Sequence, residues 1–202
     1  MPEQRLRPGE PVLAVIGPSG SGKSTVIRRL VAASVLELTP SWTTRPRRAE
    51  EAAYPEDAVE HRFVSEMEFD SLERRGFFLE SDRLFGLPFR YGLPHITHAH
   101  AEMVPAVMLR APLIPRMRVH HPQVTVYQIE DSEARAVERL RLRHPDGTDH
   151  GSRLAGYRAE LAAGRACATR VFVNDGAVDD IVRTVARAIA VDFASAAGGA
   201  LA

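Results

Sequence analysis

Lysine and cysteine are nearly absent from this chain. Its 202 residues include one lysine, Lys23, and one cysteine, Cys167, although lysine and arginine together number 26. A single cysteine excludes an internal disulfide, and it suits the reducing cytoplasm, where we expect the protein to act. Because its neighbours suggest no reactive site, Cys167 is predicted to be a small, buried apolar residue.

Long hydrophobic runs and excess charge are also missing. Residues 1–10 are polar, and the apolar segment that follows them, Val12–Ile16, is short. This pattern predicts neither a signal peptide nor a membrane span. Lysine plus arginine and aspartate plus glutamate are equal, at 26 each. The zero net charge therefore predicts no nucleic acid and no membrane among its partners; small-molecule nucleotides and a monomer or weak homodimer are expected.

The one lysine lies in a complete G-x-x-x-x-G-K-S motif, which starts at Gly17 and ends at Ser24. Glycines let the backbone curl around an anion, and the helix that follows presents its positive end to the phosphates. A compact ammonium reaches a β- or γ-phosphate where the wide fork of an arginine does not fit. The motif predicts ATP bound with Mg²⁺, the metal held by Ser24, and a nucleotide-binding loop of Gly17, Pro18, Ser19, Gly20, Ser21, Gly22, Lys23, Ser24 and Thr25.

Strand-like and helix-like segments alternate along the chain. Strands are expected at 12–16, 35–38, 103–109, 124–129 and 170–173, and helices at 24–30, 132–142, 152–163 and 177–193. Such alternation is typical of a parallel sheet covered by helices on both faces. The fold class predicted is α/β, a P-loop NTPase core with a parallel sheet flanked by helices, an inserted acceptor-binding subdomain and a small lid.

Two polar segments interrupt the alternation. Residues 41–93 are rich in proline and arginine and contain their own strands, together with a helix that Ser65 and Glu68 would cap. Residues 143–151 are charged and rich in turn-forming types. Both are predicted to be insertions over the core.

Motifs in the first insertion resemble those of guanylate kinases. Ser41-Trp42-Thr43-Thr44-Arg45-Pro46-Arg47-Arg48 is followed by Glu51, His61–Ser65, Gly76–Glu80 and Tyr91-Gly92. The resemblance covers roughly residues 11–190. It implies a single domain over 1–194, with a core of 11–40, 94–142 and 164–194, an acceptor-binding insertion of 41–93, a lid of 143–163 and a flexible tail of 195–202.

The resemblance also implies roles for individual residues. Arg45, Arg48 and Tyr91 would bind the phosphate of a monophosphate acceptor, since a dianion needs both charge and orientation. Glu80 would accept hydrogen bonds from guanine, with Ser41 beside the base. Catalysis would depend on Lys23 and on two arginines of the lid, Arg143 and Arg153. They would stabilise the negative charge that is spread over the phosphoryl group in the transition state. Asn174 resembles a position near the donor nucleotide, although a plain Asn-Asp-Gly turn explains it equally well.

Three departures from the guanylate kinase pattern point to a relative. His61 replaces a tyrosine of the acceptor site, where it would still donate to a phosphate; Leu93 replaces a hydroxyl residue; and the strand end at 104–109 lacks the usual acidic residues. The segment 110–115 instead resembles a stretch of the ribose 1,5-bisphosphate phosphokinases, which lack counterparts of Arg48 and Glu80.

Three functions follow as hypotheses. The leading one is an ATP-dependent phosphotransferase of the guanylate kinase type, with GMP as the acceptor. The second is a ribose 1,5-bisphosphate phosphokinase, and the third is a guanylate kinase-like binding module without strong catalysis. The intact phosphate-binding loop argues against the third, because a scaffold has no need of Lys23.

Three further histidines lie close together after Pro94, at positions 95, 98 and 100. A metal site is conceivable, but no cysteine or carboxylate pair flanks them. The pattern favours a polar helix face.

Overall fold

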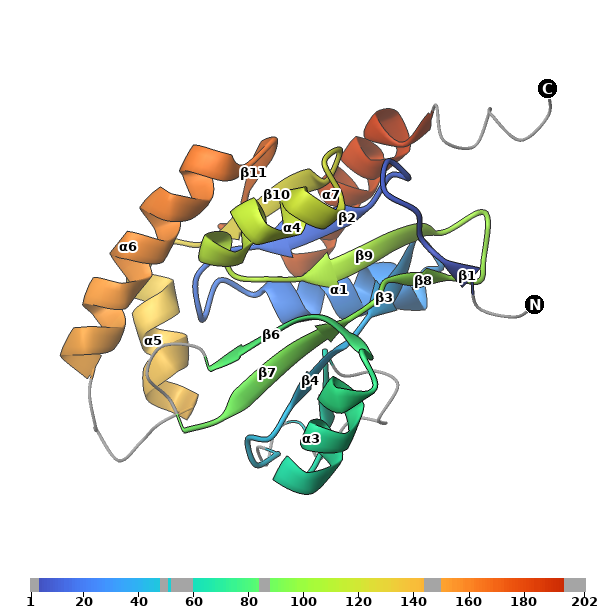
Figure 1. The fold of residues 1–202 in the computed structure, drawn as a ribbon. Coiled ribbons are helices and arrows are strands. Elements are labelled where there is room, and N and C mark those ends of the chain that lie inside the picture. The colour runs from blue at the N-terminus through green and yellow to red at the C-terminus, as the bar shows by residue number, and fades with distance from the viewer. Residues whose placement is uncertain (1–3, 48–50, 52–59, 84–87, 144–149, 195–202) are drawn as a thin grey trace.

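The central element of the computed structural model is a parallel sheet with helices on both faces (Figure 1). The structure describes residues 4–47, 51, 60–83, 88–143 and 150–194, except for the side chains of 139–143 and 150–155. In the described part the sheet has the strand order β11-β10-β2-β9-β3, all parallel. Its strands are β2 (Leu13–Ile16), β3 (Leu36–Thr39), β9 (Val104–Met108), β10 (Thr125–Glu130) and β11 (Arg170–Val173). The predicted α/β fold is confirmed.

Helices cover both faces of this sheet, and its central strand β2 is buried and apolar throughout. Leu13 and Val15 pack on one side with α1 (Lys23–Ala32) and α7 (Val178–Asp192). Ala14 and Ile16 pack on the other side with α4 (Ile114–His120). The sheet therefore separates two hydrophobic clusters, and its carboxyl edge is free to form a site.

Two helices follow β10 and lie together at the left of Figure 1. They are α5 (Glu133–Arg143) and α6 (His150–Cys167). The expected helix of 152–163 is longer in the structure, because it continues through Gly164. A Cβ at Gly164 would lie 1.6 Å from Oε1 of the buried Gln128. Glycine, which usually weakens a helix, here lets α6 lie directly against β10.

A second sheet of four strands lies beside the first, in the order β5-β4-β7-β6. The strands are β4 (Ser41–Thr43), β5 (His61–Phe63), β6 (Phe78–Arg83) and β7 (Arg90–Pro94). Helix α3 (Glu66–Arg74) packs on it through the stacked rings of Phe69 and Phe78, whose centroids are 4.5 Å apart. The predicted cap of α3 is confirmed: Ser65 accepts from the Glu68 backbone, and Glu68 accepts from the Ser65 backbone.

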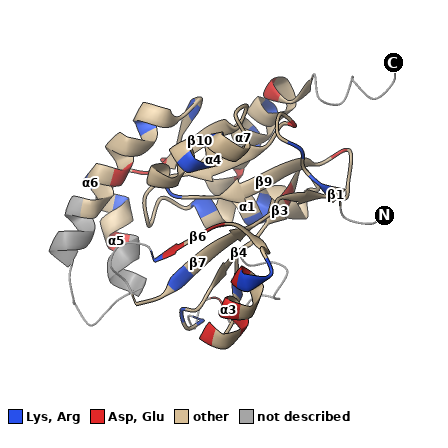
Figure 2. Ribbon diagram, in the orientation of Figure 1, with Lys and Arg blue, Asp and Glu red and all other residues tan. Residues whose placement is uncertain are grey.

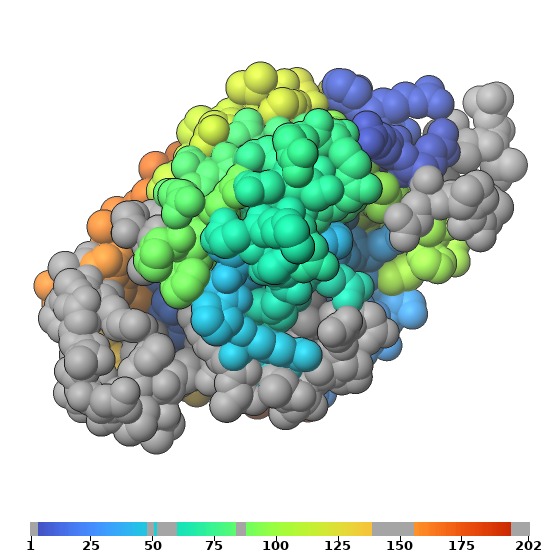
Figure 3. All heavy atoms as spheres, turned by 60° about the horizontal axis from the view of Figure 1, so that its bottom comes forward, coloured from blue at the N-terminus to red at the C-terminus, as the bar shows by residue number. Residues whose placement is uncertain are grey.

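The surface of this second sheet forms one face of the molecule, where residues 60 to 83 lie together (Figure 3). Basic and acidic positions are interspersed on α3 (Figure 2), in keeping with the zero net charge. None of the described helices is long and apolar enough to cross a membrane.

The expectation of a polar helix around His95, His98 and His100 was wrong. Thr97–His98 form strand β8, which pairs antiparallel with β1 (Gln4–Arg5). Glu37 of β3 accepts from the backbone N–H of Ala99 and His100, so hydrogen bonds to a carboxylate distant in the sequence replace those of a helix. The described residues hold no group of His, Cys, Asp and Glu that would bind a metal ion.

Candidate active site

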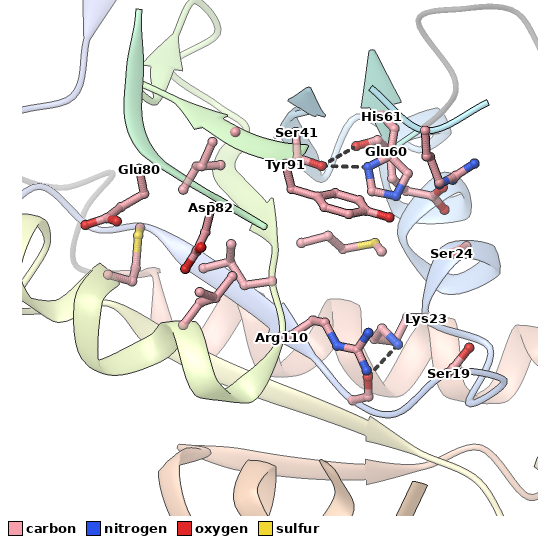
Figure 4. Close-up of a pocket in the computed structure, with 18 of the residues that line it drawn as sticks. Ser19, Lys23, Ser24, Ser41, Glu60, His61, Glu80, Asp82, Tyr91 and Arg110 are labelled. Carbon is pink, nitrogen blue, oxygen red and sulfur yellow. Dashed lines mark hydrogen bonds between the residues drawn. The ribbon is translucent and has the colours of Figure 1, made fainter. Parts of the chain in front are cut away.

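A cavity of about 550 Å³ lies between the carboxyl edge of the main sheet and the second sheet. The phosphate-binding loop contributes Gly17, Ser19, Lys23, Ser24 and Thr25 to its wall. Residues of the predicted acceptor site line it as well: Ser41, Arg45, His61, Glu80 and Tyr91. Figure 4 shows the two groups on opposite sides of one space. The fold thus brings together two sets of residues that are far apart in the sequence.

The loop after β2 needs glycine at three positions. Gly17, Gly20 and Gly22 have φ values of 144°, 85° and 86°, which residues with a Cβ rarely adopt. A Cβ at Gly17 would also lie 2.1 Å from the backbone oxygen of Ile129. The spacing of glycines in the motif is therefore a direct consequence of the curled backbone.

Lys23 and Ser24 begin α1, directly after this loop. Lys23 Nζ donates to the carbonyl oxygens of Gly17, at 2.6 Å, and Pro18, at 2.8 Å. The ammonium therefore lies at the mouth of the loop, where a bound phosphate would meet it. Pro18, Gly20, Ser21 and Gly22 shape the loop and do not line the cavity.

Asn174 supports the loop from behind. Its Nδ2 donates to the backbone oxygen of Ser21 at 3.0 Å, and its own backbone N–H donates to Glu130. The side chain is buried and is not part of the cavity wall. This position follows β11 and joins it to the loop, while a contact of Asn174 with the donor nucleotide stays a prediction.

Ser41, His61 and Tyr91 meet at the acceptor end. Ser41 Oγ lies 2.6 Å from His61 Nδ1, and the rings of His61 and Tyr91 are 6.1 Å apart between centroids. These residues come from β4, β5 and β7, which the register of the second sheet brings side by side. The three polar groups form a compact set of hydrogen-bonding partners facing the cavity.

Arg45 is held in place before any acceptor binds. Its Nη1 donates to Glu51 Oε2 at 2.8 Å, its Nη2 donates to Glu51 Oε1, and it lies over the Phe63 ring. Burial opposes the charge, but the hydrogen bond and the charge of Glu51 raise the pKa of Arg45 above its ordinary value. A buried, bidentate pair of this kind orients the guanidinium. Arg48, its expected partner in the clamp, lies outside the described residues.

Glu80 lies at the opposite end of the cavity from Ser24 (Figure 4). Its Oε2 accepts from Arg116 at 2.9 Å, and its Oε1 lies 3.2 Å from His120 Nε2. Arg116 also donates to Asp82 at 2.9 Å. Two groups of α4 thus meet two carboxylates of β6, an arrangement that no local sequence signal indicates.

Glu60 and Arg110 are among the residues of the cavity wall to which the sequence analysis gave no role. Glu60 is buried, and its Oε1 has no hydrogen-bond partner among the described residues; it lies 3.8 Å from Arg28 Nη1, which is an ion-pair distance. Arg110 follows β9 and lines the cavity near Lys23 (Figure 4). A signal for Arg110 existed, because it stands where the expected acidic residues are missing at a strand end.

The two predicted lid arginines lie in helices. Arg143 is the last residue of α5, and Arg153 lies in the first turn of α6. Their side chains are outside the described part of the structure, so their roles stay predictions.

Several curated guanylate kinases are similar to this chain in sequence. It is 30% identical over 194 residues to the guanylate kinase of Symbiobacterium thermophilum, an alignment that covers 92% of this chain and 86% of that protein. The chain belongs to the guanylate kinase family. The resemblance seen in the motifs of the first insertion is thereby confirmed at the level of the family.

Other comparisons are more partial. The chain is 39% identical to the guanylate kinase of Nitrosococcus oceani over 79 residues. This alignment covers 39% of the chain and 36% of that protein. The chain thus matches about a third of the length of several curated relatives. The crystal structure of guanylate kinase from Anaplasma phagocytophilum matches with a TM-score of 0.58 and 21% identity, covering 94% of this chain and 88% of the other, which supports the fold. No model of a protein family matches the chain.

Proposed function

We propose that this protein transfers the γ-phosphoryl group of Mg·ATP to a monophosphate acceptor, with GMP as the leading acceptor. One observation carries the proposal: a single cavity holds the phosphate-binding loop with Lys23 at one side and Arg45, His61 and Tyr91 at the other. Membership of the guanylate kinase family supports it. In this proposal residues 41–93 bind the acceptor, and residues 143–163 close over it with Arg143 and Arg153.

The reaction needs charge stabilisation and alignment more than covalent help. Arg45, with its fork fixed by Glu51, would bind two oxygens of the acceptor phosphate, and Tyr91 and His61 would orient it. Lys23 would draw the donor phosphates into the loop. Each group then acts on charge that develops as the phosphoryl group moves, which is where fixed donors act best.

The residues at the loop suit a hard cation. Ser24 offers a hydroxyl to the cavity, and the buried Glu60 carboxylate in the same cavity has one oxygen without a hydrogen-bond partner among the described residues. Oxygen donors are the ligands that Mg²⁺ takes in phosphate sites. Ser24 would hold the Mg²⁺ ion, whose contribution when bound is to neutralise and orient the β- and γ-phosphate oxygens.

One observation favours ribose 1,5-bisphosphate as a second candidate acceptor. Both oxygens of Glu80, the predicted guanine-binding group, are engaged by Arg116 and His120. The end of the cavity therefore presents the guanidinium of Arg116 as well as a carboxylate. A second phosphate of the acceptor would suit this guanidinium better than a neutral base does.

The deciding experiment is a mass-spectrometric assay of purified protein with Mg·ATP and, separately, GMP, AMP, dGMP and ribose 1,5-bisphosphate. Formation of GDP is expected. Lys23→Ala serves as the control for contaminating kinases and is expected to lower the rate by about 100-fold or more. Phosphorylation of ribose 1,5-bisphosphate alone would replace GMP by the second candidate. If the protein binds ATP but phosphorylates none of these acceptors, the proposal is contradicted and the hypothesis of a binding module is favoured.

A further inference from the structure

Arg110 emerges from the sheet directly beside the phosphate-binding loop. Strands β2 and β9 are parallel neighbours, with Val15 paired to Met108. The Leu109 N–H donates to Val15 O at 3.1 Å, so the pairing continues past the end of β9. The next step of the same register sets Arg110 against Gly17, the first residue of the loop. The two residues therefore leave the same edge of the sheet together.

The backbone of Arg110 is fixed by its neighbours. Leu109 and Ala111 are both buried in the cluster beneath α4. The Arg110 carbonyl oxygen accepts from the Leu113 N–H at 2.9 Å, at the start of the short 3₁₀ helix η3 (Ala111–Leu113). Arg110 helps to line the cavity, and this anchoring fixes the point from which its side chain starts.

The guanidinium lies between the donor and acceptor groups. Figure 4 shows it directed toward the loop, next to Lys23. Tyr91, from the acceptor side, is close enough to act on its charge. Burial lowers the pKa of Arg110 to about 10, so the group still carries its positive charge at neutral pH. A cation in this partly desolvated place interacts more strongly with phosphate than it would in water.

One protein partner of Arg110 is a carboxylate of α6, at a position within the predicted lid of 143–163. Arg110 forms an ion pair with Glu160 of α6, and α6 packs against η3. Glu160 also lines the cavity. The pair holds the guanidinium at the cavity wall and links it to α6.

We propose that Arg110 is a further catalytic residue, which binds the γ-phosphoryl group of ATP and stabilises it during transfer. This inference rests on the proposed function. In the step, an oxygen of the acceptor phosphate forms a new bond to Pγ, while the bond from Pγ to the β,γ-bridging oxygen breaks. ADP leaves with that electron pair. ATP⁴⁻ and a dianionic acceptor become ADP³⁻ and a trianionic product, so no proton moves.

Arginine fits this role because the transferring group spreads its negative charge over three oxygens. Lys23 supplies one point charge from the loop, whereas a planar fork reaches two oxygens at once.

The test compares Mg·ATP and Mg·ADP binding by calorimetry for the wild-type protein, Arg110→Gln and Arg110→Lys. Because only ATP has a γ-phosphate, Arg110→Gln is expected to weaken ATP binding by about 10-fold and to leave ADP binding within about 2-fold, from the loss of a charge-assisted hydrogen bond. Arg110→Lys retains the positive charge but lacks the planar fork, so its affinity for Mg·ATP should lie between those of the wild type and Arg110→Gln. Unchanged ADP binding also reports that each variant is folded.

Arg75→Gln is the matched control, since Arg75 is exposed and, within the described part of the chain, its side chain donates to Ser71 O of the preceding helical turn. With an acceptor that the wild type phosphorylates, Arg110→Gln should lower kcat by about 100-fold. Equal effects on ATP and ADP, or no effect on either, would overturn the inference. If the wild type phosphorylates no acceptor, the proposed function fails, and the ATP-to-ADP comparison still decides the role of Arg110.

Discussion

Lys23 and Arg45 line the same cavity with cationic groups of different shape. Lys23 is an ammonium that reaches between backbone carbonyls of the loop, 2.6 Å and 2.8 Å away. Arg45 is a planar fork whose orientation is set by Glu51. A point charge suits a phosphate wrapped by backbone amides, whereas a fork suits an exposed pair of oxygens. This difference explains why a chain so rich in arginine has lysine at this position.

Glu80 offers the sharpest residue-scale test of the acceptor. Glu80→Gln replaces an acceptor oxygen by an N–H donor, which would face the donors of guanine. If GMP is the acceptor, kcat/KM for GMP is expected to fall by about 100-fold or more, since a buried polar pair is left unmatched. Steady-state kinetics with GMP and ribose 1,5-bisphosphate measure the effect.

The control for this variant is Asp82→Asn, which removes the other carboxylate bonded to Arg116. Asp82→Asn tests whether loss of Arg116 alignment alone accounts for the change. Equal losses for both variants, or unchanged GMP kinetics in Glu80→Gln, would rule out guanine recognition by Glu80.

At the scale of elements, one glycine sets how closely α6 approaches the sheet. Gly164 faces Gln128, which is fully buried and donates through Nε2 to Leu161 O and to Glu130. Gly164→Ala is expected to destabilise the fold by about 1–3 kcal/mol, because the added Cβ would push the Gln128 side chain away from these hydrogen bonds. Denaturant unfolding would measure the change in free energy.

The same helix contains the matched control. A Cβ at Gly156 would meet nothing within 4 Å. Gly156→Ala should therefore stabilise the protein by about 0.5–1 kcal/mol through helix propensity. Stabilisation by both variants would show that the contact between α6 and β10 is looser than the structure has it.

A second link between elements depends on pH. Asp192, at the end of α7, accepts from the buried Tyr127 of β10 at 2.6 Å and from Arg170 Nε of β11 at 2.7 Å. The hydrogen bond from Arg170 lowers the pKa of Asp192 below its ordinary value. A lowered carboxyl pKa contributes stability above the unfolded pKa, about 4, and that stability is lost as the pH falls through the folded pKa.

Asp192→Asn is expected to cost about 1 kcal/mol at pH 7, because a charged acceptor becomes neutral. The difference from wild type should shrink as the pH falls below about 4. Asp179→Asn, in an exposed pair with Arg29, should cost about 0.5 kcal/mol or less. Unfolding curves at several pH values measure both variants; a pH-independent loss for Asp192→Asn would contradict the proposed charge effect.

At the scale of the whole molecule, the cavity lies where two sheets meet. Its wall combines residues of the main sheet's carboxyl edge with residues of the second sheet. A ligand there contacts a surface that only the folded chain has. Substrate binding is therefore coupled to global stability.

Mg·ATP at about 100 times its dissociation constant is expected to stabilise the protein by about 2.7 kcal/mol. For a chain of this length that corresponds to a rise in Tm of roughly 5–10 °C. Differential scanning fluorimetry measures the shift, with Lys23→Ala expected to lose most of it. The same shift in Lys23→Ala and wild type would place ATP elsewhere than in the phosphate-binding loop.

Much of this architecture could be predicted from local patterns. Strand β2, the loop and α1 were identifiable because apolar runs, glycine spacing and a lysine each have local physical causes. The capping box of α3 is another such feature, since its two hydrogen bonds join residues three apart. Helix α6 was predicted too short, because local propensity ends a helix near Gly164, whereas tertiary packing against Gln128 requires the glycine.

The sequence by itself determined the class of fold, the phosphate-binding loop and the family of this protein, because these depend on residues close together in the chain. Only the tertiary structure decided which side chains share the cavity with them. Arg110, Glu60 and Arg116 come from separate elements, and the register of parallel strands and the packing of two sheets bring them to Lys23 and Glu80. The relative positions of side chains from separate elements depend on the packing of the whole core, so no local sequence pattern predicts them.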